Sequence, residues 1–244
     1  MSAEPDSPAS REPNNEPRHL EPVVRRPPRL LYPNQLTPCD DLALFHNPQN
    51  PRSEAIRALR TRLLLARDDS LERGTIAILS PGPAEGRSRL CAELAIAFAQ
   101  LGRPTLLIDA DLRHPRQHVL FGDSNPWGLT QTLRYTEPPR MHGVEEVPEL
   151  ALLTSGGLPT NPLELLSGER FEQLMVAWQR EFEFVVIDTP PITRYSDGLV
   201  IAAAARRALV VTRATATSFN DMKEMTRQLA AVSTCVVGAV INNF

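Results

Sequence analysis

Short apolar runs that alternate with amphipathic segments constrain the fold of this chain more than any other feature of its sequence. From Ser53 onward, apolar residues at helical spacing predict helices at 53–66, 90–101, 162–181, 196–205 and 218–232. The intervening runs predict strands at 75–79, 105–108, 150–154, 184–187, 208–212 and 235–241. Apolar strands bounded by helices are typical of parallel sheets that are covered on both faces. We therefore predict an α/β fold with a mostly parallel sheet and helices on both faces.

Proline separates this predicted domain from the beginning of the chain. Eleven of the 23 prolines fall within the first 51 residues. Proline lacks a backbone N–H donor and disfavours a helical conformation in the residue before it. We therefore predict a disordered, proline-rich tail over residues 1–50 and one domain over residues 51–244, whose first helix spans 51–66.

Composition excludes several classes of protein. The 26 basic and 29 acidic residues give a net charge of -3, which excludes nucleic-acid binding through bulk positive charge. No segment approaches the roughly 20 apolar residues that span a bilayer, and the first residues lack the apolar core of a secretory signal. The three scattered cysteines predict neither a disulfide framework nor a zinc site. We expect a cytoplasmic chain without direct membrane insertion, which reaches the inner face of the membrane through a partner.

Residues 80–88, Ser-Pro-Gly-Pro-Ala-Glu-Gly-Arg-Ser, have the character of a phosphate-binding loop, and we call them the phosphate loop. Such a loop before a helix directs backbone N–H groups inward and forms an anion cradle with the helix N-terminus. Ser88 stands where a hydroxyl would bind Mg²⁺. The match to G-x-x-x-x-G-K-[ST] is imperfect because Pro81 replaces the first glycine and Arg87 replaces the lysine. An ordinary Gly/Pro connection is the alternative for this stretch alone. The candidate nucleotide-binding residues are Pro83, Ala84, Glu85, Gly86, Arg87, Ser88 and Arg89.

Aspartates follow two other predicted strands. Asp109 and Asp111 end the apolar run at 105–108, and their spacing in an extended segment directs both side chains to the same side. Asp188 ends the run at 184–187 in the manner of a Walker B aspartate. Carboxylates beside a phosphate loop suit Mg²⁺ binding and deprotonation of an attacking hydroxyl. A helix cap with a surface salt bridge would explain one aspartate of the first pair but not both.

Taken together, these motifs resemble those of the bacterial tyrosine kinases (BY-kinases), cytoplasmic P-loop proteins that regulate capsule and exopolysaccharide assembly. The resemblance covers the chain from about residue 48 to the C-terminus. Besides the phosphate loop, it rests on segments 47–61, 109–115, 128–133, 154–166 and 188–191. It implies a P-loop NTPase-like fold with ATP and Mg²⁺ as cofactors. It further implies a metal site of Ser88, Asp109 and Asp188, and catalytic roles for Asp109, Asp111 and Arg87.

The resemblance also implies partners. Glu54, Arg57 and Arg60 match an ExxRxxR helix that mediates ring-like self-association in the family. Ion pairs on a charged helix face are the alternative explanation for these three residues. The resemblance implies docking on a membrane-embedded polysaccharide copolymerase, which determines chain length.

Two departures from the family pattern bear on activity. Family kinases phosphorylate a C-terminal tyrosine cluster, whereas the tyrosines here are Tyr32, Tyr135 and Tyr195, so we expect no such cluster. Arginine keeps the charge of the Walker lysine but is planar and wider, and a displacement of about 1 Å at the reacting group costs about 100-fold in rate. We therefore expect Mg-ATP binding without efficient tyrosine autokinase activity.

Three alternatives remain open. The chain is an active ATPase or protein-tyrosine kinase that acts on another protein, or a scaffold that binds no nucleotide. The third is a partition ATPase of the MinD/ParA type, which the sequence favours less because Gly82 occupies the position of that group's signature lysine.

Overall fold

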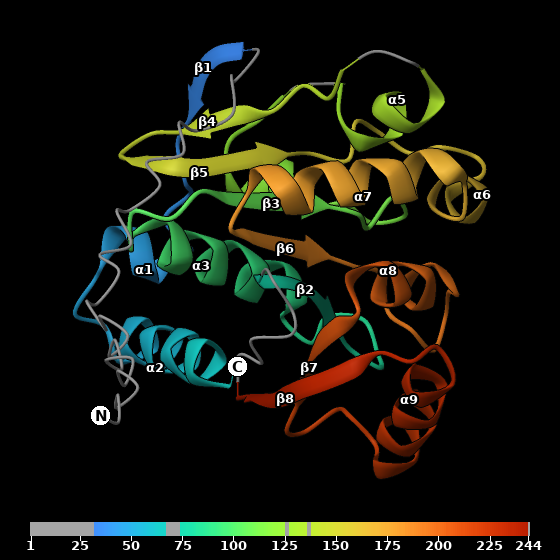
Figure 1. Ribbon diagram of the computed structural model, residues 1–244. Helices are drawn as coiled ribbons and strands as arrows, with labels where there is room; N and C mark the ends of the chain where they lie inside the picture. The colour runs from blue at the N-terminus through green and yellow to red at the C-terminus, as the bar shows by residue number, and fades with distance from the viewer. Residues whose placement is uncertain (1–31, 67–73, 125–126, 136–137, 244) are drawn as a thin grey trace, which may run out of the picture.

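The computed structural model describes residues 32–66, 74–124, 127–135 and 138–243, and in these residues the strands form one eight-stranded sheet. The strand order is β1-β4-β5-β3-β6-β2-β7-β8, as the labels in Figure 1 show. All neighbouring strands are parallel except β4 and β5, which are antiparallel. The predicted mostly parallel α/β fold is therefore confirmed. The strands are β1 (Tyr32–Leu36), β2 (Gly74–Leu79), β3 (Thr105–Asp109), β4 (His142–Val144), β5 (Val147–Leu153), β6 (Phe184–Asp188), β7 (Arg207–Arg213) and β8 (Cys235–Asn242).

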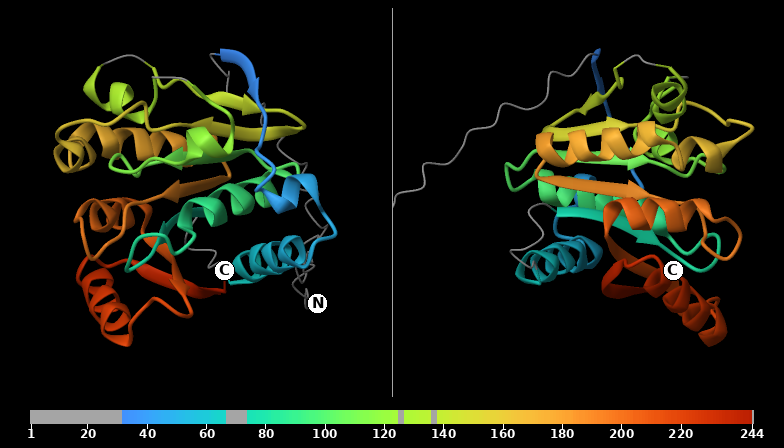
Figure 2. Two further views of the ribbon diagram at one scale, coloured as in Figure 1. Left: turned by 180° about the vertical axis from the view of Figure 1, so that it is seen from behind. Right: turned by 45° about the vertical axis from the view of Figure 1, so that its right-hand side comes forward.

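Helices cover both faces of this sheet. Helices α5 to α9 share one buried cluster with the sheet, and α1 to α3 share the other. Figure 1 shows α7 and α8 on the first face, and the reversed view in Figure 2 shows α2 and α3 on the second. None of the helices in the described ranges has the length and apolarity needed to cross a bilayer. The helices are α1 (Ala43–His46), α2 (Pro51–Leu65), α3 (Arg87–Ala99), α4 (Gln117–Leu120), α5 (Leu129–Arg134), α6 (Pro162–Leu166), α7 (Glu169–Glu181), α8 (Asp197–Ala205) and α9 (Phe219–Ala231).

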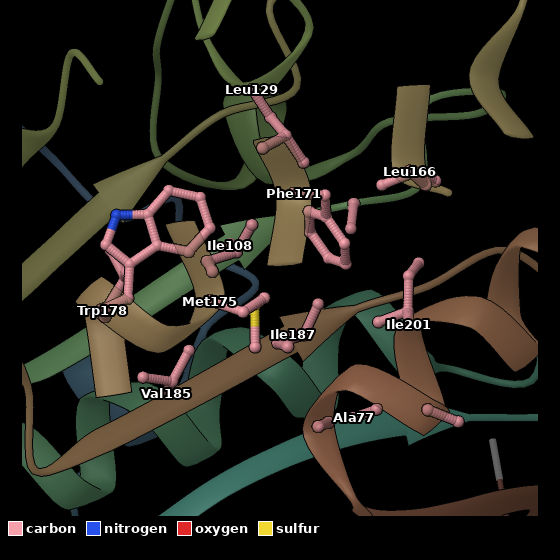
Figure 3. Packing of buried hydrophobic residues seen from close by; sticks show 14 of the residues in the cluster. Ala77, Ile108, Leu129, Leu166, Phe171, Met175, Trp178, Val185, Ile187 and Ile201 are labelled. Atoms are coloured by element: carbon pink, nitrogen blue, oxygen red, sulfur yellow. The ribbon is translucent and has the colours of Figure 1, made fainter. Parts of the chain in front are cut away.

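The core between α7 and the sheet follows from helical periodicity. Phe171, Met175 and Trp178 are three or four residues apart, so they lie on one face of α7. All three are buried, and Figure 3 shows them over Ile108 of β3 and Ile187 of β6. Burying a large apolar side chain contributes about 1.5–3 kcal/mol, so this layer fixes the two central strands whose ends carry aspartates.

Helix α3 places the phosphate loop at the carboxyl end of β2. Most of its residues are buried, as expected for a helix that is apolar nearly all round. The loop reaches the helix through Gly86, whose φ of 90° lies in the left-handed region that favours glycine. Ala84 also has a positive φ, of 57°. The N-terminus of α3 therefore faces the same sheet edge as the ends of β3 and β6.

The predicted tail boundary at residue 50 is wrong. Residues 32–50 contain β1 and α1, and Leu36, Leu42 and Leu44 are buried against the domain. Proline is tolerated in edge strands, and β1 is the edge strand of the sheet with Pro33 in it. The proline content thus concealed an apolar pattern that packs on α3. Residues 1–31 lie outside the described part of the chain.

Four further features differ from the sequence-based prediction. The helix predicted at 162–181 is two helices, α6 and α7, because the chain leaves helical geometry at Gly168, which has ψ of 151°. The short elements α4, α5 and β4 lie in a stretch for which no regular structure was predicted. Of these, α4 matters for the site, since it packs beneath the phosphate loop.

Candidate nucleotide-binding site

Strand pairing brings two of the predicted aspartates side by side. Strands β3 and β6 are neighbours, and Asp109 stands directly opposite Asp188 in their register. Both side chains are completely buried. Ser88, in the first turn of α3, hydrogen-bonds to Asp188. The structure therefore brings Ser88, Asp109 and Asp188 together, although their role in metal binding stays a prediction.

Arg87 braces the phosphate loop against the end of β6. Its Nε donates to the carbonyl oxygen of Thr189 (2.8 Å), and its Nη1 donates to the carbonyl oxygen of Gly82 (2.8 Å) and to Ser80 Oγ. Its Nη2 lies 3.9 Å from Asp111 Oδ2. The side chain is only 7% exposed. Arg87 therefore occupies the position of the Walker lysine and places its charge inside the loop. Contacts on several sides fix its guanidinium there.

Burial disfavours the ionised form of both Asp109 and Asp188. Burial raises the pKa of Asp109 well above its ordinary value, and the neighbouring charge of Asp188 raises it further. Burial also raises the pKa of Asp188, while the Arg87 charge and the Ser88 hydrogen bond partly offset this. Two such groups ionise together only with a compensating cation. The pair is therefore electrostatically suited to a bound metal ion.

Asp111 shapes the segment that follows β3. Its Oδ1 accepts hydrogen bonds from the backbone N–H of Arg113 (3.2 Å) and of His114 (2.9 Å). The Arg113 guanidinium forms two bonds to the Asp197 carboxylate, at 3.0 and 3.2 Å, and lies 4.2 Å from the ring centre of Tyr195. This segment is thereby fixed to the first turn of α8.

A cavity of about 1100 Å³ opens at this edge of the sheet. Its walls come from the phosphate loop, from residues around Asp111 to Ser124, and from the 154–158 loop. Ser88 and Asp111 line it, whereas Asp109 and Asp188 are completely buried and do not line it. Pro83, Ala84, Glu85, Gly86, Arg87 and Arg89 also line it, so every candidate nucleotide-binding residue lies at this cavity.

The oxygen atoms around Ser88 fit a magnesium ion. Asp109 Oδ1 and Asp188 Oδ1 are buried and accept no hydrogen bond from any described residue. The described residues contain no cluster of three or more His, Cys, Asp or Glu side chains that would enclose a metal by itself. Mg²⁺ instead uses one or two carboxylates together with water and substrate phosphates. Ser88, Asp109 and Asp188 would hold the ion, which when bound neutralises charge on the phosphate oxygens.

Two sets of contacts at the site were not predicted from the sequence. Gln117 in α4 donates to Asp188 and to the Ser88 carbonyl oxygen. The Glu85 carboxylate accepts hydrogen bonds from Gly82 N–H and from the Thr217 hydroxyl, and its side chain is buried. Asn242 Nδ2, at the end of β8, donates to the Glu85 carbonyl oxygen (3.0 Å). Apart from Gly82, which lies three residues from Glu85, these partners are between 29 and 157 residues away, so no local pattern indicates them.

The ExxRxxR residues all lie on α2. Arg57 pairs with Glu54 and donates to the Pro48 carbonyl oxygen (2.7 Å), while Arg60 donates to the Ala97 carbonyl oxygen of α3 (2.8 Å). The ion pair that was given as the alternative is therefore present between Glu54 and Arg57. Self-association through this helix stays a prediction.

Comparison with known proteins identifies the family. Residues 73–244 match the ParA family model, described as NUBPL iron-transfer P-loop NTPase. The tyrosine-protein kinase YwqD of Bacillus subtilis is 33% identical over 196 residues, which cover 80% of this chain and 82% of YwqD. The chain belongs to the bacterial tyrosine kinase family. A relative in Ralstonia solanacearum, EpsB, is 34% identical over 196 residues, which are 80% of this chain but 26% of EpsB. The chain therefore spans about a quarter of the length of that tyrosine kinase relative.

Solved structures of bacterial tyrosine kinases share this fold. The kinase domain of Escherichia coli tyrosine kinase Etk aligns with a TM-score of 0.78 and 29% identity, covering 83% of this chain and 79% of that domain. The chimerical protein CapA2B2 also aligns with a TM-score of 0.78 at 29% identity, covering 88% of this chain and 96% of the chimera. The septum site-determining protein MinD of Pyrococcus horikoshii, complexed with Mg-ADP, aligns at 17% identity with a TM-score of 0.61, covering 70% of each chain. At that identity the likeness to MinD concerns the fold alone.

Proposed function

We propose that this bacterial tyrosine kinase family member binds Mg-ATP at the phosphate loop and thereby regulates exopolysaccharide or capsule polymerisation and export. One observation carries the proposal: Asp109 and Asp188 are adjacent and buried, each with a carboxylate oxygen that no described residue satisfies. Two buried carboxylates in contact are costly unless a cation or a proton compensates them. A magnesium ion brought by a nucleotide supplies that charge.

In this proposal Arg87 allows nucleotide binding but slows phosphoryl transfer. Its guanidinium is tied to Thr189 and Gly82 through opposite sides of the group, so it cannot follow the γ-phosphate as a flexible lysine does. Phosphoryl transfer depends on positioning and electrostatics, and a misplacement of about 1 Å costs about 100-fold. The nucleotide state therefore controls assembly, and tyrosine autophosphorylation is at most slow.

Mg-ATP titration tests nucleotide binding. A ligand that binds only the folded state raises the free energy of unfolding by about 2.7 kcal/mol at 100 times its Kd. Urea unfolding of the full chain should show this increase with Mg-ATP. The increase should shrink with ATP in EDTA and in Asp188→Asn, which keeps the size of the side chain but removes its charge. Unchanged stability at millimolar Mg-ATP would reject the proposal.

A second candidate function is phosphoryl transfer to another protein. The observation that favours it is the Arg87 charge inside the loop, with Nη2 3.9 Å from Asp111, which keeps a cation beside the predicted catalytic carboxylate. Transfer of labelled phosphate from ATP to a partner, lost in Asp109→Asn, would support this candidate. Absence of labelling in every partner tested would argue against it.

We extend the proposal to assembly. The chain self-associates through α2 and docks on the cytoplasmic part of a polysaccharide copolymerase, which recruits it to the inner face of the membrane. The Glu54 side chain is 66% exposed, so its carboxylate is accessible to a second copy. Sedimentation velocity of Glu54→Arg should show a shift toward monomer relative to wild type, with Glu224→Arg on α9 as the control. Equal sedimentation of Glu54→Arg and wild type would reject this role for α2.

A further inference from the structure

Gln117 contacts three of the predicted functional elements at once. Its Nε2 donates to Asp188 Oδ2 at 2.8 Å and to the carbonyl oxygen of Ser88 at 2.9 Å. Its backbone N–H donates to Asp109 Oδ2 at 2.9 Å. The residue is completely buried. One glutamine therefore links the phosphate loop and the ends of β3 and β6.

The orientation of the amide follows from its neighbours. Asp188 Oδ2, when ionised, and the Ser88 carbonyl oxygen are both acceptors, so the NH₂ group must face them. The amide oxygen, Oε1, then points away from both and accepts no hydrogen bond from any described residue, although it is buried. Buried polar atoms without a partner are rare in folded proteins and call for an explanation.

In each of the two carboxylates, one oxygen accepts hydrogen bonds and the other accepts none from the described residues. Gln117 donates to Oδ2 of Asp188 through its side chain, and its backbone N–H donates to Oδ2 of Asp109 together with the backbone N–H of Arg116. In both aspartates it is Oδ1 that lacks a partner among the described residues. The same residue thus fixes both carboxylates and leaves one oxygen of each available.

We propose that Gln117 is a positioning residue of the metal site, whose amide and backbone N–H hold the Oδ2 atoms so that both Oδ1 atoms serve Mg²⁺ or its water ligands. This inference rests on the proposed Mg-nucleotide binding and names a residue outside the three predicted motifs. Partners that orient metal-binding side chains typically contribute about 10–100-fold to metal affinity. A residue that merely anchors α4 would leave that affinity unchanged.

The experiment measures Mn²⁺, a paramagnetic substitute for Mg²⁺, by electron paramagnetic resonance of the full chain with ADP. Gln117→Met keeps the length of the side chain and removes its donors, and Gln117→Glu keeps the shape and replaces the donors by acceptors. We expect Mn²⁺ affinity to fall by about 10–100-fold in both variants. ADP affinity measured in EDTA should stay within about twofold of wild type, and Gln100→Met, at the exposed C-cap of α3, should match wild type throughout.

Each other outcome overturns the inference. Unchanged Mn²⁺ affinity in both variants would show that Gln117 does not orient the site, and tighter binding by Gln117→Glu would make the residue a direct ligand. If the variants lose ADP affinity equally with Mn²⁺ and in EDTA, or if both variants fail to fold, Gln117 is only a structural anchor. If Mn²⁺ strengthens ADP binding equally in wild type and in both variants, only this inference fails. If Mn²⁺ has no effect on ADP binding by wild type, the proposed metal site fails as well. If wild type binds no nucleotide under either condition, the proposed function fails with it.

Discussion

Replacing Arg87 by lysine should move stability and catalysis in opposite directions. Lysine has one nitrogen, which can reach Ser80 Oγ and the Gly82 carbonyl oxygen but not Thr189 as well. The variant Arg87→Lys therefore loses the buried bond from Nε to the Thr189 carbonyl oxygen, which is 2.8 Å long. Hydrogen bonds to charged groups contribute about 1.5–3 kcal/mol, so the free energy of unfolding should fall by about that amount.

The same substitution should restore phosphoryl transfer. A lysine without the bond to Thr189 can follow the γ-phosphate. Correcting a misplacement of about 1 Å should raise the rate of phosphoryl transfer about 100-fold. Urea unfolding without nucleotide measures the first effect, with an unchanged m-value as the sign that only stability has changed. Initial rates of ATP hydrolysis with Mg²⁺ measure the second effect.

Arg103→Lys is the matched control for this experiment. Arg103 lies outside the cavity, beyond the C-terminal end of α3, and pairs with Glu183 at 3.0 Å, with both side chains partly exposed. Exposed pairs of this kind contribute about 0–1 kcal/mol, so this variant should differ little from wild type in either assay. An Arg87→Lys protein as stable as wild type and equally slow would refute the account of Arg87 as a brace that hinders transfer.

Three further predictions concern buried polar groups. Because the raised pKa of Asp109 makes the folded state hold its proton more tightly, stability of the metal-free protein should fall as pH rises from the ordinary value of 3.8 through the raised pKa. Asp109→Asn should flatten this slope in thermal unfolding, and an equally steep slope would contradict the assignment. Thr217→Val removes a donor to the buried Glu85 carboxylate and should cost about 1–3 kcal/mol in urea unfolding, and an unchanged midpoint would contradict this. Arg52→Met removes the ion-pair partner of the buried Glu93, so unfolding at neutral pH should be easier by about 3–5 kcal/mol; a loss below about 1 kcal/mol, the value of an exposed pair, would contradict it.

The parts of the site that the sequence could predict are those that follow from strand geometry. Asp109 and Asp188 each end an apolar run, and parallel strands bring such ends to one edge of the sheet. The phosphate loop was recognisable because its glycine and serine keep their spacing around Arg87. These predictions needed only local patterns and the rule for parallel sheets, and the structure brings the residues together as expected.

The missed residues depend on contacts that no local pattern encodes. Gln117 reaches Asp188 across 71 residues and Asn242 reaches Glu85 across 157, so only the folded chain shows them.

The tail boundary was misplaced for a different reason. The high proline content predicted disorder, whereas the folded chain buries Leu42 and Leu44 in one cluster with α3.

Calorimetric titration of the full chain with Mg-ADP tests the central claim most directly, namely that Ser88, Asp109 and Asp188 form one metal–nucleotide site. We predict saturable binding at one site, weakened when EDTA replaces Mg²⁺ and weakened again when Ser88→Ala or Asp188→Asn replaces wild type. Binding that is indifferent to both the metal and these side chains, or no binding at millimolar nucleotide, would contradict it.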